Sequence, residues 1–340
     1  MNPKLAKHIL VIRLSAMGDV AMSVPVLRAL TEQYPNIKVT VLTKSFFSPF
    51  FRDLPNVSVF SAEVKGKHKG IIGLYKLSKE LKRLKVDALA DLHDVLRSNT
   101  LKIFLSGMPF VQIDKGRKEK KALVSGKICE QLKTTHQRYA DVFQKLGYTI
   151  DLSNPSFPEK ASLNDKTQKF IVGNSKKIIG IAPFAAHESK MYPLDLMEQV
   201  IETLSKAYHI ILFGGGRQEI EILDSFERKF ENVTSVAGKL SLNEELDVIS
   251  NLDVMLSMDS GNGHIAAMFG VKTITIWGVT HPYAGFAPFN QPNDYMLLAD
   301  KNLYPAIPTS IYGNKYPEGY EKASGSIPPN VVVEKTRSIL

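Results

Sequence analysis

One stretch organises this sequence: it reads LSMDSGNGHIAA and covers residues 256–267. The apolar run at 252–256 predicts a buried parallel strand, because short apolar runs bounded by small polar residues are typical of such strands. Asp259 and Ser260 follow this strand, and Gly261 begins a helical pattern. A strand that passes through small residues into a helix directs unpaired backbone N–H groups and a positive helix end to one point. This geometry suits a phosphate, and an ordinary turn capped by Ser260 is an equal alternative.

Carboxylates also follow two other predicted strands, each at the start of a helix. Asp19 comes after the strand at 8–14 and opens a helix over 20–34, and the loop between them lacks the G-x-G-x-x-G spacing of a dinucleotide fold. Glu219 comes after three glycines, 214–216, which allow the backbone to approach a ligand closely. Each carboxylate is explained either as a helix cap favoured by the helix dipole or as a functional group, for Glu219 an acceptor for ribose hydroxyls.

Strands and helices alternate along the chain, which indicates parallel sheets wound by right-handed crossovers. We expect strands at 8–14, 37–43, 57–61, 87–92, 177–182, 209–213, 233–237, 252–256 and 272–277, and helices at 20–34, 46–52, 71–84, 136–146, 193–207, 241–251, 261–269 and 331–340. A chain of 340 residues is too long for one ordinary core, so two domains are expected. Their predicted bounds are 1–165 and 176–325, with a linker within 151–177. The last residues, 326–340, form a terminal helix that is a candidate to pack back on the first domain.

The composition is that of a soluble globular protein. No apolar run approaches the roughly 20 residues of a membrane-spanning helix. Residues 1–7 lack the apolar core of a secretory signal, so we expect a cytoplasmic protein. Cys129 is the only cysteine, which excludes an internal disulfide and a cysteine-rich zinc site. No cluster of His and acidic residues has metal-ligand spacing, so we expect neither a metal nor a cofactor.

Charge is unevenly distributed between the two halves of the chain. Residues 1–150 hold 26 Lys and Arg against 12 Asp and Glu, whereas the remainder holds 17 against 22. A basic first half indicates an anionic partner such as nucleic acid, an acidic membrane surface or a phosphorylated substrate, and solvated lysine-rich helices are the alternative. Nucleic acid is disfavoured because no basic motif is interleaved with aromatic residues. The densest basic run, 114–127, is either a solvated helix face, which we favour, or a cradle for an acidic acceptor.

Three pieces of the sequence resemble the heptosyltransferase family, the two-domain enzymes that build bacterial lipopolysaccharide. The pieces are ILVIRLSAMGDV with PVLRAL (9–20 and 25–30), IAP with KMYP (181–183 and 190–193), and MDSG with HIAA, the strand at 271–278 and THP (258–261, 264–267 and 280–282). The resemblance spans about residues 8–290. It implies two Rossmann-like α/β domains that face each other across a cleft, the GT-B arrangement, with the carboxyl-terminal domain binding a nucleotide sugar.

The resemblance further implies an inverting, metal-independent transfer of heptose from an ADP-sugar donor to an anionic, lipid-linked inner-core acceptor, in the cytoplasm and in peripheral contact with the inner membrane. The family assigns the general base to Asp19, the donor phosphates to Lys190, and the ribose to Glu219. It also implies donor contacts at Gly214, Gly215, Leu240 (near adenine), Asp259, Ser260, Gly261 and His264, and acceptor-side contacts at Ser15 and Gly18.

The sequence departs from the family pattern at two places. Ala185 and Ala186 replace hydroxyl residues that touch the donor phosphates in some members, so those contacts are expected to move to backbone N–H groups. The tail at 304–329 resembles a segment that contains cysteine in some relatives and has none here. Two other functions remain open: another nucleotide-sugar transferase or epimerase of the same fold, and a non-catalytic nucleotide-binding protein.

Overall fold

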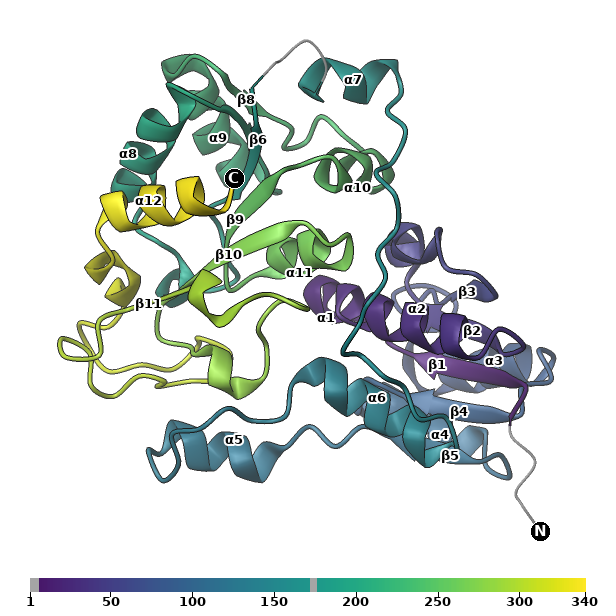
Figure 1. Ribbon diagram of the computed structural model, residues 1–340. Helices are drawn as coiled ribbons and strands as arrows, with labels where there is room; N and C mark the ends of the chain where they lie inside the picture. Colours follow the sequence, from purple (N-terminus) through teal and green to yellow (C-terminus); the bar gives the residue numbers. More distant parts are fainter. Residues whose placement is uncertain (1–5, 172–175) are drawn as a thin grey trace. The chain divides into compact units, whose positions relative to one another are not determined.

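The computed structural model describes residues 6–171 and 176–340, which group into two compact units (Figure 1). Unit 1 comprises residues 1–115 and 135–156, and unit 2 comprises residues 116–134 and 157–340. Residues 1–5 of the amino-terminal stretch and residues 172–175 of the expected linker lie outside the described residues. Each unit is a parallel α/β layer structure, as the alternation of elements predicts.

Unit 1 is built on a parallel sheet of five strands in the order β3-β2-β1-β4-β5. The strands are β1 (His8–Ile12), β2 (Lys38–Thr43), β3 (Val57–Ser61), β4 (Ala88–Asp91) and β5 (Phe110–Gln112). Its helices are α1 (Met17–Ala21), α2 (Ser23–Gln33), η1 (Ser45–Phe51), α3 (Gly70–Lys82), α4 (Leu96–Phe104) and α6 (Thr135–Lys145). The central strand β1 is an apolar run because helices cover both faces of the sheet.

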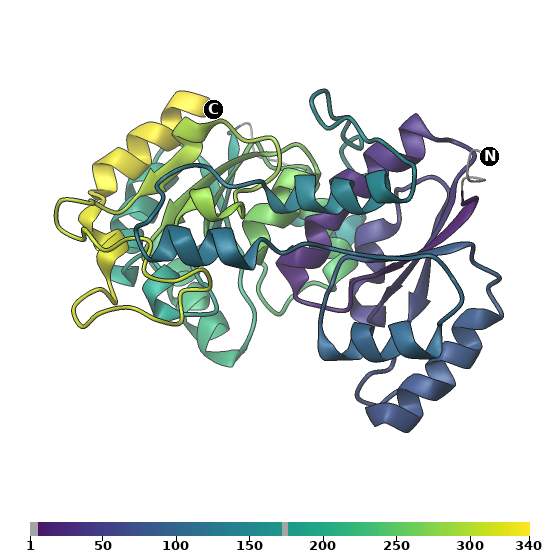
Figure 2. The ribbon, with the colours of Figure 1, turned by 90° about the horizontal axis from the view of Figure 1, so that it is seen from below.

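The strand order changes direction at β1, and this places the helices of unit 1 on opposite faces. The chain moves outward through α2 to β2 and β3, then returns through α3 to β4 and through α4 to β5. Because such crossovers are right-handed, α3 and α4 share one face, and α2 packs with α6 on the other. Figure 2 shows the blue helices α3 and α4 together on one side of the strands.

Unit 2 is built on a parallel sheet of six strands in the order β11-β10-β9-β6-β7-β8. The strands are β6 (Ile178–Ala182), β7 (His209–Leu212), β8 (Val233–Ser235), β9 (Val254–Met258), β10 (Lys272–Trp277) and β11 (Met296–Leu298). The α-helices are α5 (Arg117–Val124), α7 (Asp165–Ile171), α8 (Leu194–Ser205), α9 (Arg217–Lys229), α10 (Leu242–Ser250), α11 (Gly261–Met268) and α12 (Pro329–Ile339). Short 3₁₀ turns are η2 (Glu188–Lys190), η3 (Pro282–Ala284), η4 (Asn293–Tyr295) and η5 (Ala323–Ser326).

The terminal helix packs on unit 2, which corrects the expectation that it returns to the first domain. Helix α12 lies against α8 and β9 (Figure 1). Its buried residues Val332 and Val333 belong to the same apolar core as Ile201 and Leu204 of α8. The 3.6-residue period of α12 therefore serves the second core, not the first.

The basic segment 116–134 also belongs to unit 2, although the sequence bounds place it in the first domain. Leu123 and Leu132 are buried with Ala284, and the Leu132 N–H donates to the Tyr283 carbonyl at 2.9 Å. With this segment assigned, unit 1 holds 20 Lys and Arg against 11 Asp and Glu, whereas unit 2 holds 23 of each. The excess positive charge is thus confined to unit 1. Unit 2 has equal numbers of basic and acidic residues, whereas the two sequence halves indicate an acidic second domain.

Candidate active site

The turn between β9 and α11 has the form expected from the sequence. Ser260 stands in an extended conformation at the helix N-cap, and its side chain makes no capping hydrogen bond. Its Oγ atom is buried and has no hydrogen-bond partner within the part of the chain that is described. A Cβ atom on Gly263 would lie 2.5 Å from Ser257 Oγ, so only glycine fits between the strand and the first helical turn. The Ser260 hydroxyl therefore neither caps α11 nor bonds to another described group, and it lies beside the amino end of that helix.

The Asp259 carboxylate is held by two side chains that come from neighbouring loops of unit 2. Lys190 Nζ lies 2.9 Å from Asp259 Oδ2, and the Thr280 hydroxyl donates to the same oxygen at 2.8 Å. The Lys190 and Asp259 side chains are only 14% and 8% exposed. The structure thus brings together two predicted site residues, and it adds Thr280, to which the sequence assigned no role.

Lys190 is positioned by a buried framework around η2. The Ser189 hydroxyl donates to the Gly313 carbonyl at 2.5 Å, and the Val279 N–H donates to the Ser189 carbonyl at 3.2 Å. A Cβ atom on Gly313 would lie 2.6 Å from the Lys190 side chain, so the loop at 310–314 lies directly against the lysine stem. These contacts fix the ammonium group at the carboxyl edge of the sheet.

The remaining donor-side candidates follow β7 and β8. Glu219 lies in the first turn of α9, and its Oε2 accepts the Gly215 N–H at 2.7 Å. This bond holds the glycine loop, including Gly214, and it uses one carboxylate oxygen of Glu219. Leu240 is partly exposed and directly precedes α10, whose N-cap Ser241 forms the expected capping box with Glu244.

The carboxyl edge of the unit 2 sheet collects all of these residues. Lys190 follows β6, Glu219 follows β7, Leu240 follows β8, Asp259 follows β9 and Thr280 follows β10. His264 is buried on the first turn of α11. Ligands of open α/β sheets bind outside the carboxyl ends of the strands, so this edge is the candidate ligand site of unit 2.

Asp19 lies at the carboxyl edge of the unit 1 sheet, in the first turn of α1. Its carboxylate forms an ion pair with the buried Arg13 guanidinium and accepts the Ala16 N–H at 3.2 Å. Arg13 Nη1 also donates to the Leu92 carbonyl at 2.6 Å, and the Tyr139 hydroxyl donates to the Asp19 carbonyl at 3.3 Å. Asp19 therefore does cap its helix, and Arg13 additionally fixes the direction of its carboxylate.

His93 is a second polar group at this edge that the sequence interpretation missed. Its Nε2 lies 3.4 Å from the Ser15 hydroxyl, and its backbone N–H donates to Asp91 Oδ1 at 2.9 Å. Burial is the main cause that lowers the pKa of His93 to about 4, and the neighbouring Arg13 and Lys115 cations contribute to this decrease. At neutral pH the imidazole is uncharged, so it can accept or donate one hydrogen bond beside the acceptor-side candidates Ser15 and Gly18.

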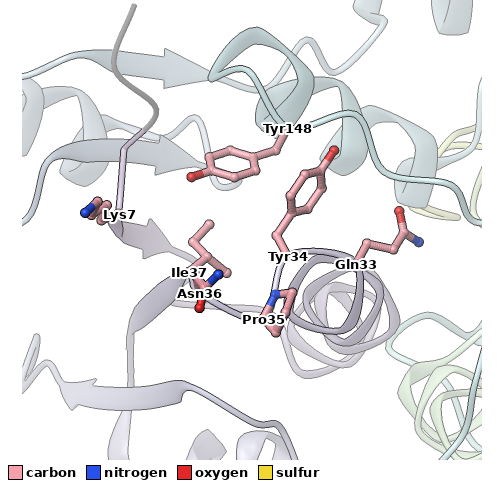
Figure 3. A pocket seen from close by; sticks show the side chains of 7 residues that line it. All are labelled: Lys7, Gln33, Tyr34, Pro35, Asn36, Ile37 and Tyr148. Carbon is pink, nitrogen blue, oxygen red and sulfur yellow. The ribbon is translucent and has the colours of Figure 1, made fainter.

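A cavity of about 750 Å³ lies elsewhere in unit 1 (Figure 3). It is bounded by Lys7 and Ile37, which directly precede β1 and β2, and by the edge-to-face rings of Tyr34 and Tyr148. This is the amino edge of the sheet, opposite to Asp19. Both phenol hydroxyls donate to backbone carbonyls, Tyr34 to Thr149 and Tyr148 to Ala6. We therefore place the candidate chemistry at the carboxyl edges of the sheets and not at this cavity.

Two features are absent from the described ranges 6–171 and 176–340. No group of three or more His, Cys, Asp or Glu side chains is placed to hold a metal ion. No helix there has the length and apolar character needed to cross a bilayer.

A family model for glycosyltransferase family 9 (heptosyltransferase) matches residues 74–306, which is well over half of the sequence. The chain belongs to glycosyltransferase family 9. It is therefore a glycosyltransferase, and the family expected from the three sequence pieces is confirmed. The match begins within α3 and runs through the β9–α11 turn to the loop after β11.

Two curated relatives show how far the family 9 likeness extends. The lipopolysaccharide core heptosyltransferase OpsX of Haemophilus influenzae is 23% identical, and the alignment covers 87% of this chain and 86% of that protein. The lipooligosaccharide heptosyltransferase 2 of Campylobacter jejuni is also 23% identical, with 95% of this chain and 96% of that protein covered. The likeness thus includes both units.

Solved structures confirm the α/β fold of this family 9 enzyme. A glycosyl transferase family 9 protein of Veillonella parvula has a TM-score of 0.76 at 18% identity, with 98% of this chain and 97% of that chain covered. The Escherichia coli ADP-heptose lps heptosyltransferase II has a TM-score of 0.69 at 19% identity, with 98% of each chain covered. The predicted GT-B class, with two Rossmann-like parallel sheets, is confirmed.

Proposed function

We propose that this enzyme is an inverting glycosyltransferase that moves heptose, or a closely related sugar, from an ADP-sugar to a lipopolysaccharide inner-core acceptor. The names of its relatives support this substrate class: one is a lipopolysaccharide core heptosyltransferase, and a structural neighbour is an ADP-heptose lps heptosyltransferase. Because the acceptor is lipid-linked, we infer that the enzyme works at the cytoplasmic face of the inner membrane. The positive charge of unit 1 suits an acceptor that carries phosphates.

In this proposal, unit 2 holds the donor. The Ser260 hydroxyl and the N–H groups that open α11 receive the diphosphate, since Ser260 Oγ has no partner within the described chain and caps none of these N–H groups. Lys190 neutralises the charge that develops on the departing ADP, and Asp259 and Thr280 hold its ammonium group in place. The second Glu219 oxygen accepts a ribose hydroxyl, with the adenine near Leu240.

In the same proposal, unit 1 supplies the base. The Asp19 carboxylate takes the proton of the acceptor hydroxyl as that oxygen bonds to the anomeric carbon. The bond from the anomeric carbon to ADP breaks at the same time, and its electron pair leaves with the diphosphate. Attack from the face opposite ADP inverts the configuration. The ion pair with Arg13 is the observation that supports this role for Asp19. It fixes the direction of the Asp19 carboxylate, and the Asp19 side chain remains 31% exposed and can receive a proton.

Asp19→Asn tests this mechanism because the amide keeps the shape of the side chain and loses its basicity. We expect kcat to fall about 10²- to 10⁴-fold, the usual contribution of a general base, with little change in ADP affinity by calorimetry. Asp53→Asn, which changes an exposed carboxylate of the same unit, is the control and should leave both quantities unchanged. Transfer that survives Asp19→Asn would remove the assigned base.

Calorimetry with ADP, UDP and GDP separates the proposed donor from the alternatives. We expect ADP to bind most tightly, with transfer only from the ADP-sugar. Tighter UDP binding with interconversion of a UDP-sugar would instead indicate an epimerase. Nucleotide binding without transfer from any donor would indicate a non-catalytic protein.

A further inference from the structure

The solvent face of α3 and α4 carries large apolar side chains that unit 1 does not cover. Ile71 and Ile72 at the start of α3 are 71% and 75% exposed. Leu96 and Ile103 of α4 are 83% and 70% exposed. We call the surface formed by Ile71, Ile72, Tyr75, Leu96 and Ile103 the α3–α4 face. Single exposed apolar residues are common, but several on two adjacent helices indicate a binding surface.

The helical period explains why these side chains stay outside the core. Leu74, Leu77 and Leu81 form the buried stripe of α3 and pack into the unit 1 core. Ile71 and Tyr75 lie one turn apart on the flank of this stripe, and Ile72 lies closer to the opposite side of the helix. The fold of unit 1 therefore buries one apolar stripe of α3 and leaves a second group of apolar side chains exposed to solvent.

The same face is strongly basic. Residues 65–85 contain eight Lys and Arg, all exposed, against one acidic residue, Glu80. Glu80 is already paired, with Lys67 Nζ at 3.5 Å and with His68 Nε2 at 3.4 Å. The exposed lysines and arginine of α3 and its end are Lys76, Lys79, Lys82 and Arg83. An amphipathic helix with exposed isoleucines beside lysines is typical of segments that lie on anionic membranes.

Contacts between the helices make the α3–α4 face one continuous surface. The Tyr75 and Phe104 rings meet edge to face at 5.5 Å between centroids. Lys79 Nζ lies 4.7 Å from the Tyr75 ring centroid, and Lys102 Nζ lies 5.0 Å from the Phe110 ring centroid. The lysine stems thus extend the apolar surface and carry their charges at its border.

The face also has a defined place relative to Asp19. Helices α3 and α4 each run back against the strands, so both helices begin at the carboxyl edge of the unit 1 sheet. Ile71, Ile72 and Leu96 lie at these amino-terminal ends. The exposed isoleucines and Asp19 therefore share one edge of the sheet.

We propose that the α3–α4 face binds an anionic phospholipid surface. Ile71, Ile72 and Leu96 enter the boundary between headgroups and acyl chains, and the lysines of α3 contact lipid phosphates. The benefit of membrane binding rests on the proposed function, because a lipid-linked acceptor would then reach Asp19 from the bilayer. No part of α3 or α4 crosses the membrane in this arrangement.

Co-sedimentation with vesicles tests the face directly. Wild-type protein should bind vesicles of phosphatidylcholine and phosphatidylglycerol, release them at high salt, and bind pure phosphatidylcholine weakly. Ile71→Ser with Ile72→Ser should lower the partition coefficient about tenfold, since both side chains leave the apolar layer. Lys79→Ala with Lys82→Ala should lower binding and weaken its salt dependence. The matched control is Leu303→Ser with Val331→Ser, two exposed apolar residues of unit 2, which should not change binding.

Three outcomes overturn the proposal. Wild-type affinity in the Ile71/Ile72 variant, measured on protein with unchanged circular dichroism, would remove the apolar contact. Equal binding to charged and uncharged vesicles would remove the role of the lysines. A concentration-dependent dimer that the Ile71/Ile72 variant abolishes would assign the face to a second copy of the chain.

The failure of this inference can be told apart from the failure of the proposed function. Transfer to a delipidated, water-soluble acceptor should be the same in wild type and in the Ile71/Ile72 variant, whereas transfer to an acceptor embedded in anionic vesicles should fall. Vesicle binding without any transfer from ADP-heptose would reject the proposed function but would still support lipid binding by the α3–α4 face. Soluble transfer without vesicle binding would reject the face and keep the proposed function.

Discussion

The pairing of Lys190 with Asp259 sets what each residue can do. Two charges removed from water are costly unless each satisfies the other, and here Thr280 supplies a further hydrogen bond to the carboxylate. A lysine held in this way has its ammonium protons directed by the protein before a ligand arrives. Preorganised charge of this kind stabilises a leaving diphosphate better than a mobile surface lysine does.

Lys190→Met should weaken both the fold and the donor site. Removing one member of a buried pair leaves Asp259 uncompensated, so we expect the free energy of unfolding to fall by about 3–5 kcal/mol. We expect ADP affinity to fall about 10- to 100-fold, the equivalent of one charge-assisted hydrogen bond. Urea unfolding and calorimetry measure the two effects.

The double variant Lys190→Met with Asp259→Leu separates these effects. Replacing both partners by apolar side chains should recover much of the stability, while ADP affinity stays low. Recovery of ADP affinity along with stability would show that Lys190 acts only on the fold.

His93 should make stability depend on pH. Its pKa in the fold is about 4, below the 6.5 of an unfolded histidine. Between these values the unfolded chain binds the extra proton, so stability is full above about pH 6.5 and falls as the pH decreases toward 4. The maximum contribution of this depressed pKa is about 3 kcal/mol.

Urea unfolding at pH 7 and pH 4.5 checks this for His93→Gln, which should lose less stability than wild type on acidification. His281, whose pKa burial also lowers to about 4, provides a parallel variant in unit 2. Identical pH dependence in His93→Gln and wild type would mean that folding leaves the pKa of His93 unchanged.

Among the candidate site residues, those inside short motifs stand out in the sequence, whereas the side chains that contact them do not. Asp19, Lys190 and Asp259 lie in sequence pieces with a recognisable order of strand, small residues and helix. Thr280 reaches the Asp259 carboxylate only through the packing of β10 beside β9, and Arg13 reaches Asp19 only through the fold of the turn between β1 and α1. One signal for Arg13 was present: it is a lone charge that extends the apolar run of β1.

At the scale of elements, the loop at 310–314 is a support for Lys190. Gly313 has φ +82°, and an added Cβ would lie 2.6 Å from the lysine Cγ and Cδ atoms. Gly313→Ala should therefore displace the lysine stem and lower ADP affinity, by about tenfold if one charged hydrogen bond is lost. Titration calorimetry with ADP measures this change.

Gly319→Ala is a matched control for this variant. Gly319 has a similar φ of +84°, but an added Cβ meets no atom within 4 Å. It should show the backbone strain of alanine at positive φ without the loss of ADP affinity. Equal affinity losses in the two variants would mean that strain, and not contact with Lys190, explains the effect.

Long, periodic elements were predictable, and short or irregular ones were not. Strand β3 and helix α10 have the expected bounds to within one residue, because alternating or capped patterns define their ends. The sequence interpretation missed α4, α7, β5 and β11; the two strands have only three residues each, and α7 lies within the expected linker. The helix expected at 20–34 is divided into α1 and α2, since Pro25 has no N–H to bond the Ala21 carbonyl.

At the scale of the whole molecule, the chain passes between the two units more often than a simple two-domain sequence predicts. Residues 116–134 leave unit 1 after β5, pack in unit 2, and return at α6. Sequence composition could not indicate this, because the segment is rich in lysines and carries few large apolar residues. The buried Leu123 and Leu132, with the partly buried Ile128, pack against apolar residues of the second unit.

Leu123→Ala should loosen unit 2 locally. The side chain is buried against Leu132 and Ala284, so its truncation should cost about 2–4 kcal/mol of local stability. Hydrogen exchange should increase at residues 128–132 and 283–286 and stay unchanged in β1. Leu303→Ala, an exposed site in unit 2, is the control. Unchanged exchange at 283–286 would show that the segment is not held by this cluster.

The same excursion has a consequence for how the chain is made. Leu132 emerges from the ribosome about 150 residues before Tyr283, whose carbonyl accepts its N–H. At usual rates of translation this delay lasts roughly 10–30 s, and Leu123, Ile128 and Leu132 have no native surface to cover them in that time. The nascent chain thus presents a short, basic, leucine-bearing segment, the kind of sequence that chaperones bind, until the second sheet is complete.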